Sequence, residues 1–389
     1  MALTLDGTNG IVSSGSITTQ SATGVIFSDS SNQGAAASPF SLKNRIINGD
    51  MVIDQRNSGA SVTASNTGNF SLDRWQLYSS TTGKFTAQQN AASVTPPVGF
   101  TNYAGCTSTS AYSITSTDQM LFQQKIEGYN VADLAWGTAN ARTVTLSFWV
   151  RSSLTGTFGG SLQNNAQNRC FPFSYTISAA NTWEYKTITI PGDTTGTWLT
   201  TNGLGISVAF SLGTGATYSA TANTWTGTSF ITSVPGATSV VGTNGATFYV
   251  TGVQLERNTT ATPFEWIPFG MELLLCQRYY EKSYDLGTAV GASTSNGQRV
   301  SSGNTGTNTT SEILMSCEFS VKKRIGPTVV IFDSVGNSGK CTRTNIGVGN
   351  FDNEVAATVL SSENNVFVFS NTGTNAGIIR YHFTASAEI

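Results

Sequence analysis

The stretch Thr143-Val-Thr-Leu-Ser-Phe-Trp-Val150 alternates apolar and polar residues along almost its whole length. The even-numbered residues from Val144 to Val150 are apolar, and Trp149 interrupts the polar set between them. A period of two is the pattern of a β-strand that turns one face to a core and the other away from it. We therefore predict a strand here, with Trp149 on the polar face.

Four further stretches read as strands, most of them with the same alternation. They are residues 72–78, 183–190, 204–212 and 247–256. Residues 45–54 predict two short strands around the turn-forming pair Asn48-Gly49. Short strands that are parted by Gly-rich turns, with no helical signal between them, favour a β-sandwich of jelly-roll type over residues 44–268.

The composition agrees with an all-β protein. Charged residues make up 11% of the 389 residues, well below the usual quarter, while Thr, Ser, Asn and 40 glycines replace the residues that helical surfaces prefer. Aromatic residues make up 10% and the net charge is only −2, so the chain can bury a core and does not resemble a disordered protein.

Charge and hydropathy exclude two classes of partner. Lys and Arg are scattered, so there is no basic field for nucleic acid. No apolar run approaches the roughly 18 residues that span a membrane, and the start of the chain lacks the pattern of a signal peptide. We expect no nucleic-acid binding and no membrane insertion, and synthesis in the cytoplasm.

Residues 1–43 are small and polar and cannot enclose a core, which predicts a flexible leader or an extended N-terminal arm that pairs with partner chains. Between Met271 and Tyr284 the apolar spacing changes to about 3.6, which predicts a helical neck over 269–284. Residues 285–389 return to strand patterns and predict a smaller C-terminal β-sandwich.

The residues that carry chemistry elsewhere are sparse. The single histidine, His382, lies between two aromatic residues in a predicted strand, so we expect no Ser or Cys triad and no catalytic residue. The five cysteines show no C-x-x-C spacing, so we expect no zinc site and no cofactor. A calcium ion that bridges strands through Asp73 or Glu256 stays an open alternative.

Aromatic residues are the stronger functional signal. Aromatic planes stack on the apolar faces of sugar rings, while Asn, Gln and Thr bind the hydroxyls. The candidate glycan-binding residues are Trp149, Trp183, Trp198, Tyr218 and Trp225. The alternative is that each of these rings packs the outer face of the sandwich against a neighbouring part of the protein.

Six segments of the chain form a further pattern: Asn44-Arg-Ile-Ile-Asn-Gly-Asp50, Leu72-Asp-Arg-Trp75, Gly252-Val-Gln-Leu-Glu256, Thr262-Pro-Phe-Glu-Trp266, Cys276-Gln-Arg-Tyr-Tyr-Glu-Lys282 and the terminal residues 381–389. Through these segments the chain, from residue 44 to the end, resembles the structural fibre proteins of tailed bacteriophages, especially those of marine bacteria and cyanobacteria. The central strands are similar to carbohydrate-binding jelly rolls through Leu146-Ser-Phe-Trp-Val-Arg151 and Asn181-Thr-Trp-Glu-Tyr185.

The resemblance implies a homotrimer in the virion, with an N-terminal segment that docks on other tail or baseplate proteins and a distal part that faces the host. A threefold axis could bury one face of the predicted helix, with Leu273, Leu274, Tyr280 and Tyr284 as candidate interface residues. The expected function is a tail fibre that attaches the virion to a host surface glycan. Two alternatives stay open: a capsid or baseplate decoration fibre, and a glycan-degrading tailspike.

Overall fold

The structure, a computed structural model, describes residues 25–26, 32–33, 42–302, 312–345, 349–371 and 378–389. The chain divides into two compact units, Met1–Lys43 and Asn44–Ile389. In the first unit, β1 (Val25–Ile26) pairs antiparallel with β2 (Asn32–Gln33). The remainder of the predicted arm over residues 1–43, apart from residues 42 and 43, lies outside the described residues.

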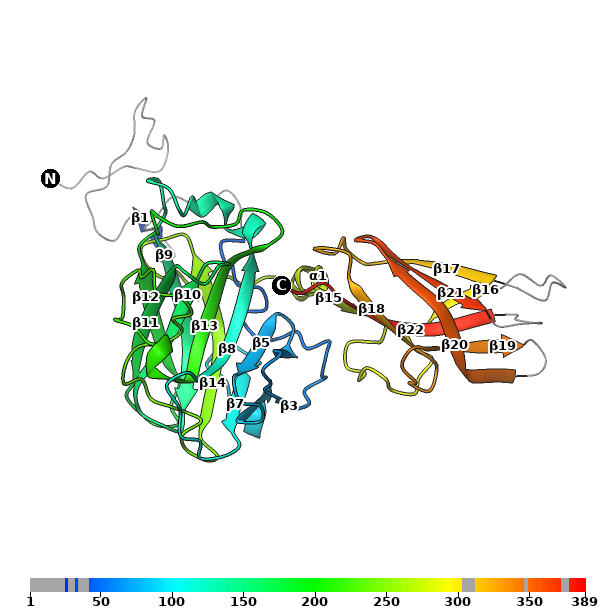
Figure 1. Cartoon of the computed structure of the whole chain (residues 1–389), viewed down its shortest axis with the longest axis horizontal. Coiled ribbons are helices and arrows are strands. Elements are labelled where there is room, and N and C mark those ends of the chain that lie inside the picture. Colours follow the sequence, from blue (N-terminus) through cyan, green and yellow to red (C-terminus); the bar gives the residue numbers. More distant parts are fainter. Residues whose placement is uncertain (1–24, 27–31, 34–41, 303–311, 346–348, 372–377) are drawn as a thin grey trace, which may run out of the picture. The chain divides into compact units, whose positions relative to one another are not determined.

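The second unit begins with a β-sandwich of two six-stranded antiparallel sheets (Figure 1). The first sheet has the order β11-β10-β13-β8-β5-β4. Its strands are β4 (Asn69–Leu72), β5 (Trp75–Ser79), β8 (Gln119–Glu127), β10 (Gly156–Gln163), β11 (Cys170–Ile177) and β13 (Leu204–Thr214). The second sheet has the order β12-β9-β14-β7-β6-β3. Its strands are β3 (Val62–Thr63), β6 (Phe85–Gln89), β7 (Ala104–Ser108), β9 (Val144–Ser152), β12 (Glu184–Ile190) and β14 (Thr247–Glu256).

The alternation in the sequence sets which residues form the core between these sheets. Val144, Leu146, Phe148 and Val150 of β9 are all fully buried in one cluster. In the facing sheet, Met120, Phe122 and Ile126 of β8 belong to the same cluster, and Phe122 stacks on Trp75 with ring centroids 4.8 Å apart. Burial of apolar side chains between two sheets is the main force that stabilises such a sandwich.

Strands that are distant in sequence pair in both sheets. β8 pairs with β13, and β9 pairs with β14, so the chain crosses repeatedly between the sheets, as it does in jelly rolls. The prediction of an all-β sandwich is confirmed. Short 3₁₀ helices occupy some of the connections: η1 (Ala91–Ser93), η2 (Gly128–Asn130), η3 (Ala132–Leu134) and η4 (Ala216–Tyr218).

Two local predictions in the first part of the sandwich are corrected. Residues 45–54 form no strands, because the buried side chain of Asn48 pairs with the backbone of Ile53 and Asp73 and holds this segment as a loop. Residues 72–78 span the end of β4 and most of β5, and Arg74 takes a left-handed conformation (φ 70°) at the turn between them.

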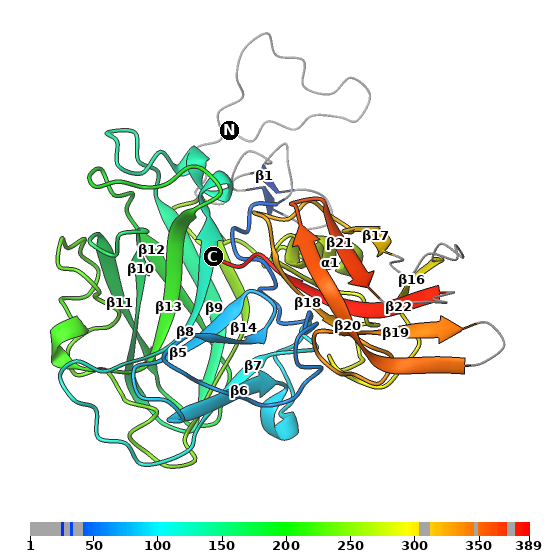
Figure 2. The ribbon, with the colours of Figure 1, turned by 45° about the vertical axis from the view of Figure 1, so that its right-hand side comes forward.

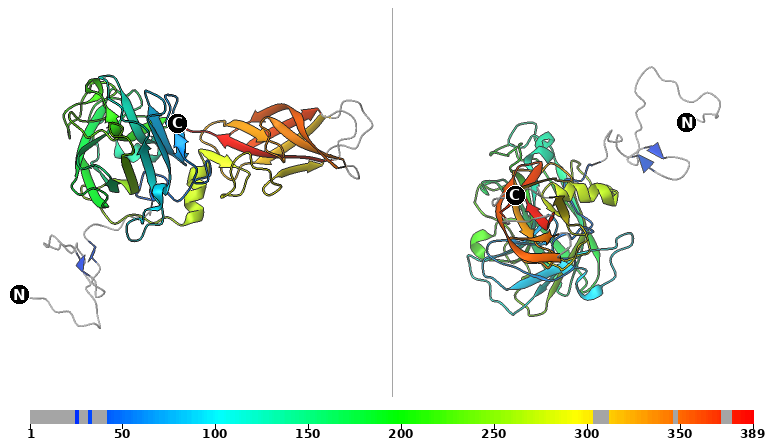
Figure 3. Two further views of the ribbon diagram at one scale, coloured as in Figure 1. Left: turned by 90° about the horizontal axis from the view of Figure 1, so that it is seen from below. Right: turned by 90° about the vertical axis from the view of Figure 1, so that its right-hand side faces the viewer.

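The predicted helix over residues 269–284 is shorter than expected. Helix α1 (Phe269–Gln277), the yellow-green helix of Figure 3, ends before the two tyrosines, and β15 (Tyr280–Lys282) follows it. Tyrosine is a good strand former, and β15 gains a ladder with the terminal strand, with Tyr280 opposite Ser386. Among the described residues, no helix is long and apolar enough to cross a membrane.

The C-terminal part forms a second, smaller β-structure with its own core. Its strands pair in the order β15-β22-β19-β20-β21-β17, and β16 and β18 also pair with β22. The strands are β16 (Arg299–Ser302), β17 (Glu312–Glu318), β18 (Thr328–Phe332), β19 (Lys340–Asn345), β20 (Gly349–Ser361), β21 (Asn365–Asn371) and β22 (Ile378–Ser386). The core cluster is Phe319, Ile331, Cys341, Val366, Val368, Ile379, Tyr381, Phe383 and Ala385.

Charged contacts link α1, β15 and the end of the chain to the first sandwich. The Arg278 guanidinium binds both carboxylate oxygens of Glu127, at 2.6 and 2.9 Å. Arg56 donates to the Glu388 carboxylate at 2.7 Å, and Arg74 also contacts this carboxylate. Paired, bidentate contacts of this kind fix geometry more than they add net stability.

Candidate functional site

A polar groove lies on the outer face of the first sheet. On β8, Met120 and Phe122 point into the core, so the residues that alternate with them point outward. Figure 2 shows β13, β8 and β5 of this sheet toward the viewer. The groove has a volume of about 400 Å³. Its lining residues are Asn66, Thr67, Gln76, Tyr78, Gln119, Leu121, Gln123, Lys125, Gln167, Tyr218, Phe230 and Thr232.

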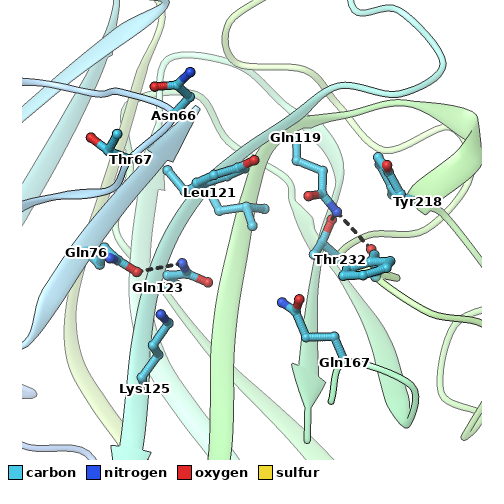
Figure 4. A pocket seen from close by; sticks show the side chains of 12 residues that line it. Asn66, Thr67, Gln76, Gln119, Leu121, Gln123, Lys125, Gln167, Tyr218 and Thr232 are labelled. Atoms are coloured by element: carbon cyan, nitrogen blue, oxygen red, sulfur yellow. Dashed lines mark hydrogen bonds between the residues drawn. The ribbon is translucent and has the colours of Figure 1, made fainter. Parts of the chain in front are cut away.

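Strand register places two of its amides side by side on the groove floor. Gln76 of β5 lies directly opposite Gln123 of β8, and the Gln123 amide donates to the Gln76 carbonyl at 2.9 Å (Figure 4). Among the described residues, this pairing leaves the amide nitrogen of Gln76 and the carbonyl oxygen of Gln123 available to a ligand. The floor therefore offers a donor and an acceptor next to each other.

The connection between β13 and β14 forms one wall of the groove. Gln119 of β8 donates to the carbonyl of Phe230 at 2.8 Å and contacts the Thr232 hydroxyl at 3.3 Å (Figure 4). Phe230 lies edge-on to Tyr218, with ring centroids 6.3 Å apart, and is 47% exposed. These bonds hold in place the connection that carries two of the aromatic rings of the groove.

The described residues that line the groove include one cation and no carboxylate. The cation is Lys125, whose ammonium donates to the Ile389 backbone oxygen at 3.2 Å. Burial and, second, the neighbouring charge of Arg74 lower the pKa of Lys125. The groove is therefore suited to hydrogen bonding with a ligand that is not strongly cationic.

The structure does not bring the five predicted aromatic residues together. Tyr218 lines the groove, whereas Trp149 lies on the outer face of the second sheet, in a separate hollow. Trp183 packs edge-on against Tyr103, and its indole donates to the Thr95 carbonyl at 2.9 Å. Trp183 therefore packs on a neighbouring ring and remains half-buried, and its role in glycan binding stays a prediction.

Trp198 and Trp225 are held in a cluster of three indoles. Both lie edge-on to Trp136, at centroid distances of 4.7 and 5.4 Å, and all three pack on the main core. Their indole nitrogens donate to backbone carbonyls, Trp198 to Thr195 at 3.1 Å and Trp225 to Pro191 at 2.8 Å. These contacts hold both partly buried rings in place, and a role for Trp198 and Trp225 in glycan binding stays a prediction.

The predicted interface residues also separate by burial. Tyr280 and Tyr284 are 6% and 4% exposed within this chain, so they leave little surface for a second copy. Leu273 is half-buried against Ile47, Ile53 and Cys276, whereas Leu274 is 46% exposed. Of the four residues, Leu274 presents the largest free side-chain surface, and association itself stays a prediction.

The two carboxylates considered for calcium have protein partners. Asp73 is buried beside Arg56 and accepts a hydrogen bond from Gln55. Glu256 accepts hydrogen bonds from Gln254 and Thr262. No group of three or more His, Cys, Asp and Glu that could hold a metal ion occurs among the described residues.

The glutamines of the groove were not among the site residues predicted from the sequence. Gln119 and Gln123 recur four residues apart in a predominantly apolar stretch, which places both on the outward face of a strand. That spacing was a readable signal for a polar outer face. The pairing of Gln123 with Gln76 depends on the register of two strands that are far apart in the sequence.

No family model and no curated protein matches the sequence. Among solved structures, the chain is similar to the enzymatically active domain of tailspike protein 4 of bacteriophage CBA120, with 14% identity and a TM-score of 0.30, over 55% of this chain and 21% of the tailspike chain.

Two further similarities are to sugar-binding proteins. One is a carbohydrate-binding module described as CBM4, with 15% identity and a TM-score of 0.27, over 54% of this chain and 98% of the module. The other is a putative sugar binding protein from Bacteroides thetaiotaomicron, with 12% identity and a TM-score of 0.33, over 55% of this chain and 100% of that protein. The all-β class of the chain rests on its own strand pairing.

Proposed function

We propose that this chain is a glycan-binding protein and that the groove over β5 and β8 holds a segment of a polysaccharide. The observation that carries the proposal is that four glutamines, Gln76, Gln119, Gln123 and Gln167, line one groove together with the rings of Tyr218 and Phe230. A sugar hydroxyl can donate and accept hydrogen bonds, and an amide side chain can likewise act as donor or acceptor. Aromatic rings add contact with the apolar faces of the sugar ring.

We propose further that the chain is not an enzyme. Most glycoside hydrolases need two carboxylates on either side of the scissile bond. The described lining of the groove contains no Asp or Glu, which supports binding without cleavage. Release of reducing ends from a polysaccharide on incubation with the purified protein would support the tailspike alternative instead.

At the level of the whole particle, we propose a tail fibre of a tailed bacteriophage, homotrimeric, which attaches the virion to a host surface glycan. The resemblance of residues 44–389 to phage fibres supports this role, and the arm over residues 1–43 would dock on the tail or baseplate. Three copies would add their weak contacts into a strong attachment, because linked sites raise avidity.

The groove is tested by affinity electrophoresis and calorimetry against an array of bacterial and algal polysaccharides. We expect Gln76→Ala with Gln123→Ala to weaken binding about tenfold or more, since each lost hydrogen bond costs about 1 kcal/mol. The matched control is Gln88→Ala, an amide of β6 in the other sheet. Equal affinity of the double variant and the control would reject the groove.

The role in the virion is tested separately. Purified protein should block adsorption of the phage to host cells, and density of the whole virion should place the chain in the tail. Two results together would support the decoration fibre instead. The protein would fail to bind host cells at micromolar concentration, and virion density would place it on the capsid or baseplate.

A further inference from the structure

A second hollow lies on the opposite face of the sandwich from the groove. It is on the outer face of the second sheet, because the even-numbered residues of β9 fill the core and Trp149 points away from it. Its volume is also about 400 Å³. It is lined by Val98, Phe100, Ser147, Trp149, Tyr185, Gly252, Ala261, Thr262, Pro263, Phe264 and Trp266.

Five aromatic rings form this aromatic hollow. On the sheet, Trp149 of β9 lies against Tyr185 of β12, with centroids 5.3 Å apart and planes inclined by 49°. On the loops, the ring centroid of Phe100 lies 5.2 Å from that of Phe264 and 4.8 Å from that of Trp266. The rings are inclined to one another, so they make a cradle and not a flat platform.

A glycine and a bulge allow the two groups of rings to meet. The register of β14 against β9 shifts between Thr251 and Gln254, and Gly252 within this shift has φ +60°. A Cβ atom at Gly252 would lie 2.6 Å from the ring of Phe100 and 3.2 Å from that of Trp149. Bulges of this kind commonly re-aim side chains beside functional sites.

Buried polar side chains fix the loop that carries Phe264 and Trp266. The fully buried Gln254 accepts a hydrogen bond from the Glu265 backbone at 2.8 Å. The buried Glu256 accepts from the Thr262 backbone at 2.8 Å and from its hydroxyl at 2.7 Å. Rings that are held before a ligand arrives cost less conformational entropy on binding.

The size and charge of the hollow define the class of its occupant. A volume of about 400 Å³ lies in the range of small-ligand sites, whereas a protein partner needs about 800 Å² of surface on each side. None of its described lining residues is charged, which favours a neutral ligand. Three of the lining residues, Ser147, Tyr185 and Thr262, carry a hydroxyl, so the lining is not purely apolar.

We propose that the aromatic hollow is a second carbohydrate site, which takes the apolar face of a neutral sugar unit, and that one chain binds two glycan segments on opposite faces. The inference rests on the proposed glycan-binding function. Two sites that face away from each other would bridge neighbouring polysaccharide chains and would not extend one continuous site. A single chain would then gain from the same avidity as a linked pair of binding modules.

Intrinsic fluorescence distinguishes the two sites. Trp149 and Trp266 line the hollow, whereas the rings of the groove are Tyr78, Tyr218 and Phe230. The probe is the neutral oligosaccharide that gives the strongest signal on the polysaccharide array. Its titration is followed by tryptophan emission and by calorimetry, with the stoichiometry expressed per chain.

The variants are chosen from exposed rings so that the fold is retained. Trp266→Ala and Tyr185→Ala remove rings that are 54% and 43% exposed, and Tyr129→Ala removes an unrelated ring that is 61% exposed. We expect two sites per chain in the unaltered protein and the Tyr129→Ala control. The double variant Trp266→Ala with Tyr185→Ala should lower the affinity of the hollow for the oligosaccharide about tenfold or more and abolish the fluorescence change.

The groove variant Gln76→Ala with Gln123→Ala should lose one site and keep the fluorescence change. One site per chain, with binding unaffected by Trp266→Ala, would overturn the second site and leave the proposed function standing. Binding that depends on the hollow alone would reject the groove and the pair of sites together. A fall in the particle mass of the Trp266→Ala variant would identify the hollow as a contact between copies and overturn the inference.

Discussion

Glu272, on the first turn of α1, gives a sharp test of the electrostatics in this fold. Its side chain is 5% exposed and accepts a hydrogen bond from the backbone of Asn48. Burial raises the pKa of Glu272 from 4.5 to about 7, and the nearby carboxylates of Asp50 and Glu265 act in the same direction. The folded protein therefore holds a proton on Glu272 at a pH where the unfolded chain has lost it.

The sign of the stability change follows from proton binding. Between pH 4.5 and about 7 the folded state binds more protons at Glu272 than the unfolded state, so the free energy of unfolding falls as pH rises through this range. One unit of pKa shift corresponds to ~1.4 kcal/mol. Above pH 7, Glu272 therefore lowers the free energy of unfolding by about 3 kcal/mol relative to its value below pH 4.5.

The substitution Glu272→Gln should remove this cost, because glutamine keeps an oxygen that accepts from Asn48 and cannot ionise. We expect the variant to match the unaltered protein at pH 4.5 and to be more stable by about 3 kcal/mol at pH 8. Urea unfolding at several pH values, followed by tryptophan emission, reports the first sandwich, because all seven tryptophans lie within residues 44–268.

The control is Glu318→Gln, which replaces an exposed carboxylate of β17. It should leave the pH dependence of unfolding unchanged. If Glu272→Gln shows the same slope of stability against pH as the unaltered protein, then Glu272 is ionised in the folded state and the reasoning from burial is wrong.

Three further predictions concern backbone strain, the helix and a buried ion pair. Gly252→Ala should cost about 2 kcal/mol, because φ +60° strains any side chain, and a thermal melt that matches the unaltered protein would contradict this. Leu274→Asp should keep the fold because Leu274 is exposed, whereas Tyr280→Asp should unfold the chain because Tyr280 is buried. Light scattering on the Leu274→Asp variant then shows whether an assembly dissociates to single chains of 41.0 kDa. Glu281→Gln leaves the buried ammonium of Lys323 without its counter-charge and should cost about 3 kcal/mol in urea unfolding, so an unchanged midpoint would refute the pairing.

Four strands of the first sandwich, β9, β12, β13 and β14, were the most predictable part of this protein, whereas β8, β10 and β11 were not among the predicted strands. The period of two in residues 143–150 matches β9 (Val144–Ser152), and residues 247–256 match β14. Such a pattern is local, because each side chain faces the core or the outside according to its own place in the strand. Contacts with distant residues are not needed to read it.

The helix shows where local pattern fails. Residues 271–284 carry an apolar spacing near 3.6, yet the chain leaves the helix after Gln277 and Tyr280 enters a strand beside β22. The decision depends on residues 384–386, more than a hundred positions away, which offer backbone partners to Tyr280–Lys282. A short helix is marginal by itself, so such a partner can end it.

The sequence by itself determined the all-β class, the core face of residues 143–150 and the outward position of Trp149. Only the tertiary structure decided which outward residues meet. It joined Gln76 to Gln123 across one sheet, gathered Trp149 with Trp266 on the other, and packed Trp198 and Trp225 on the core. The physical reason is that alternation specifies the face of a residue, whereas strand register and loop paths specify its neighbours.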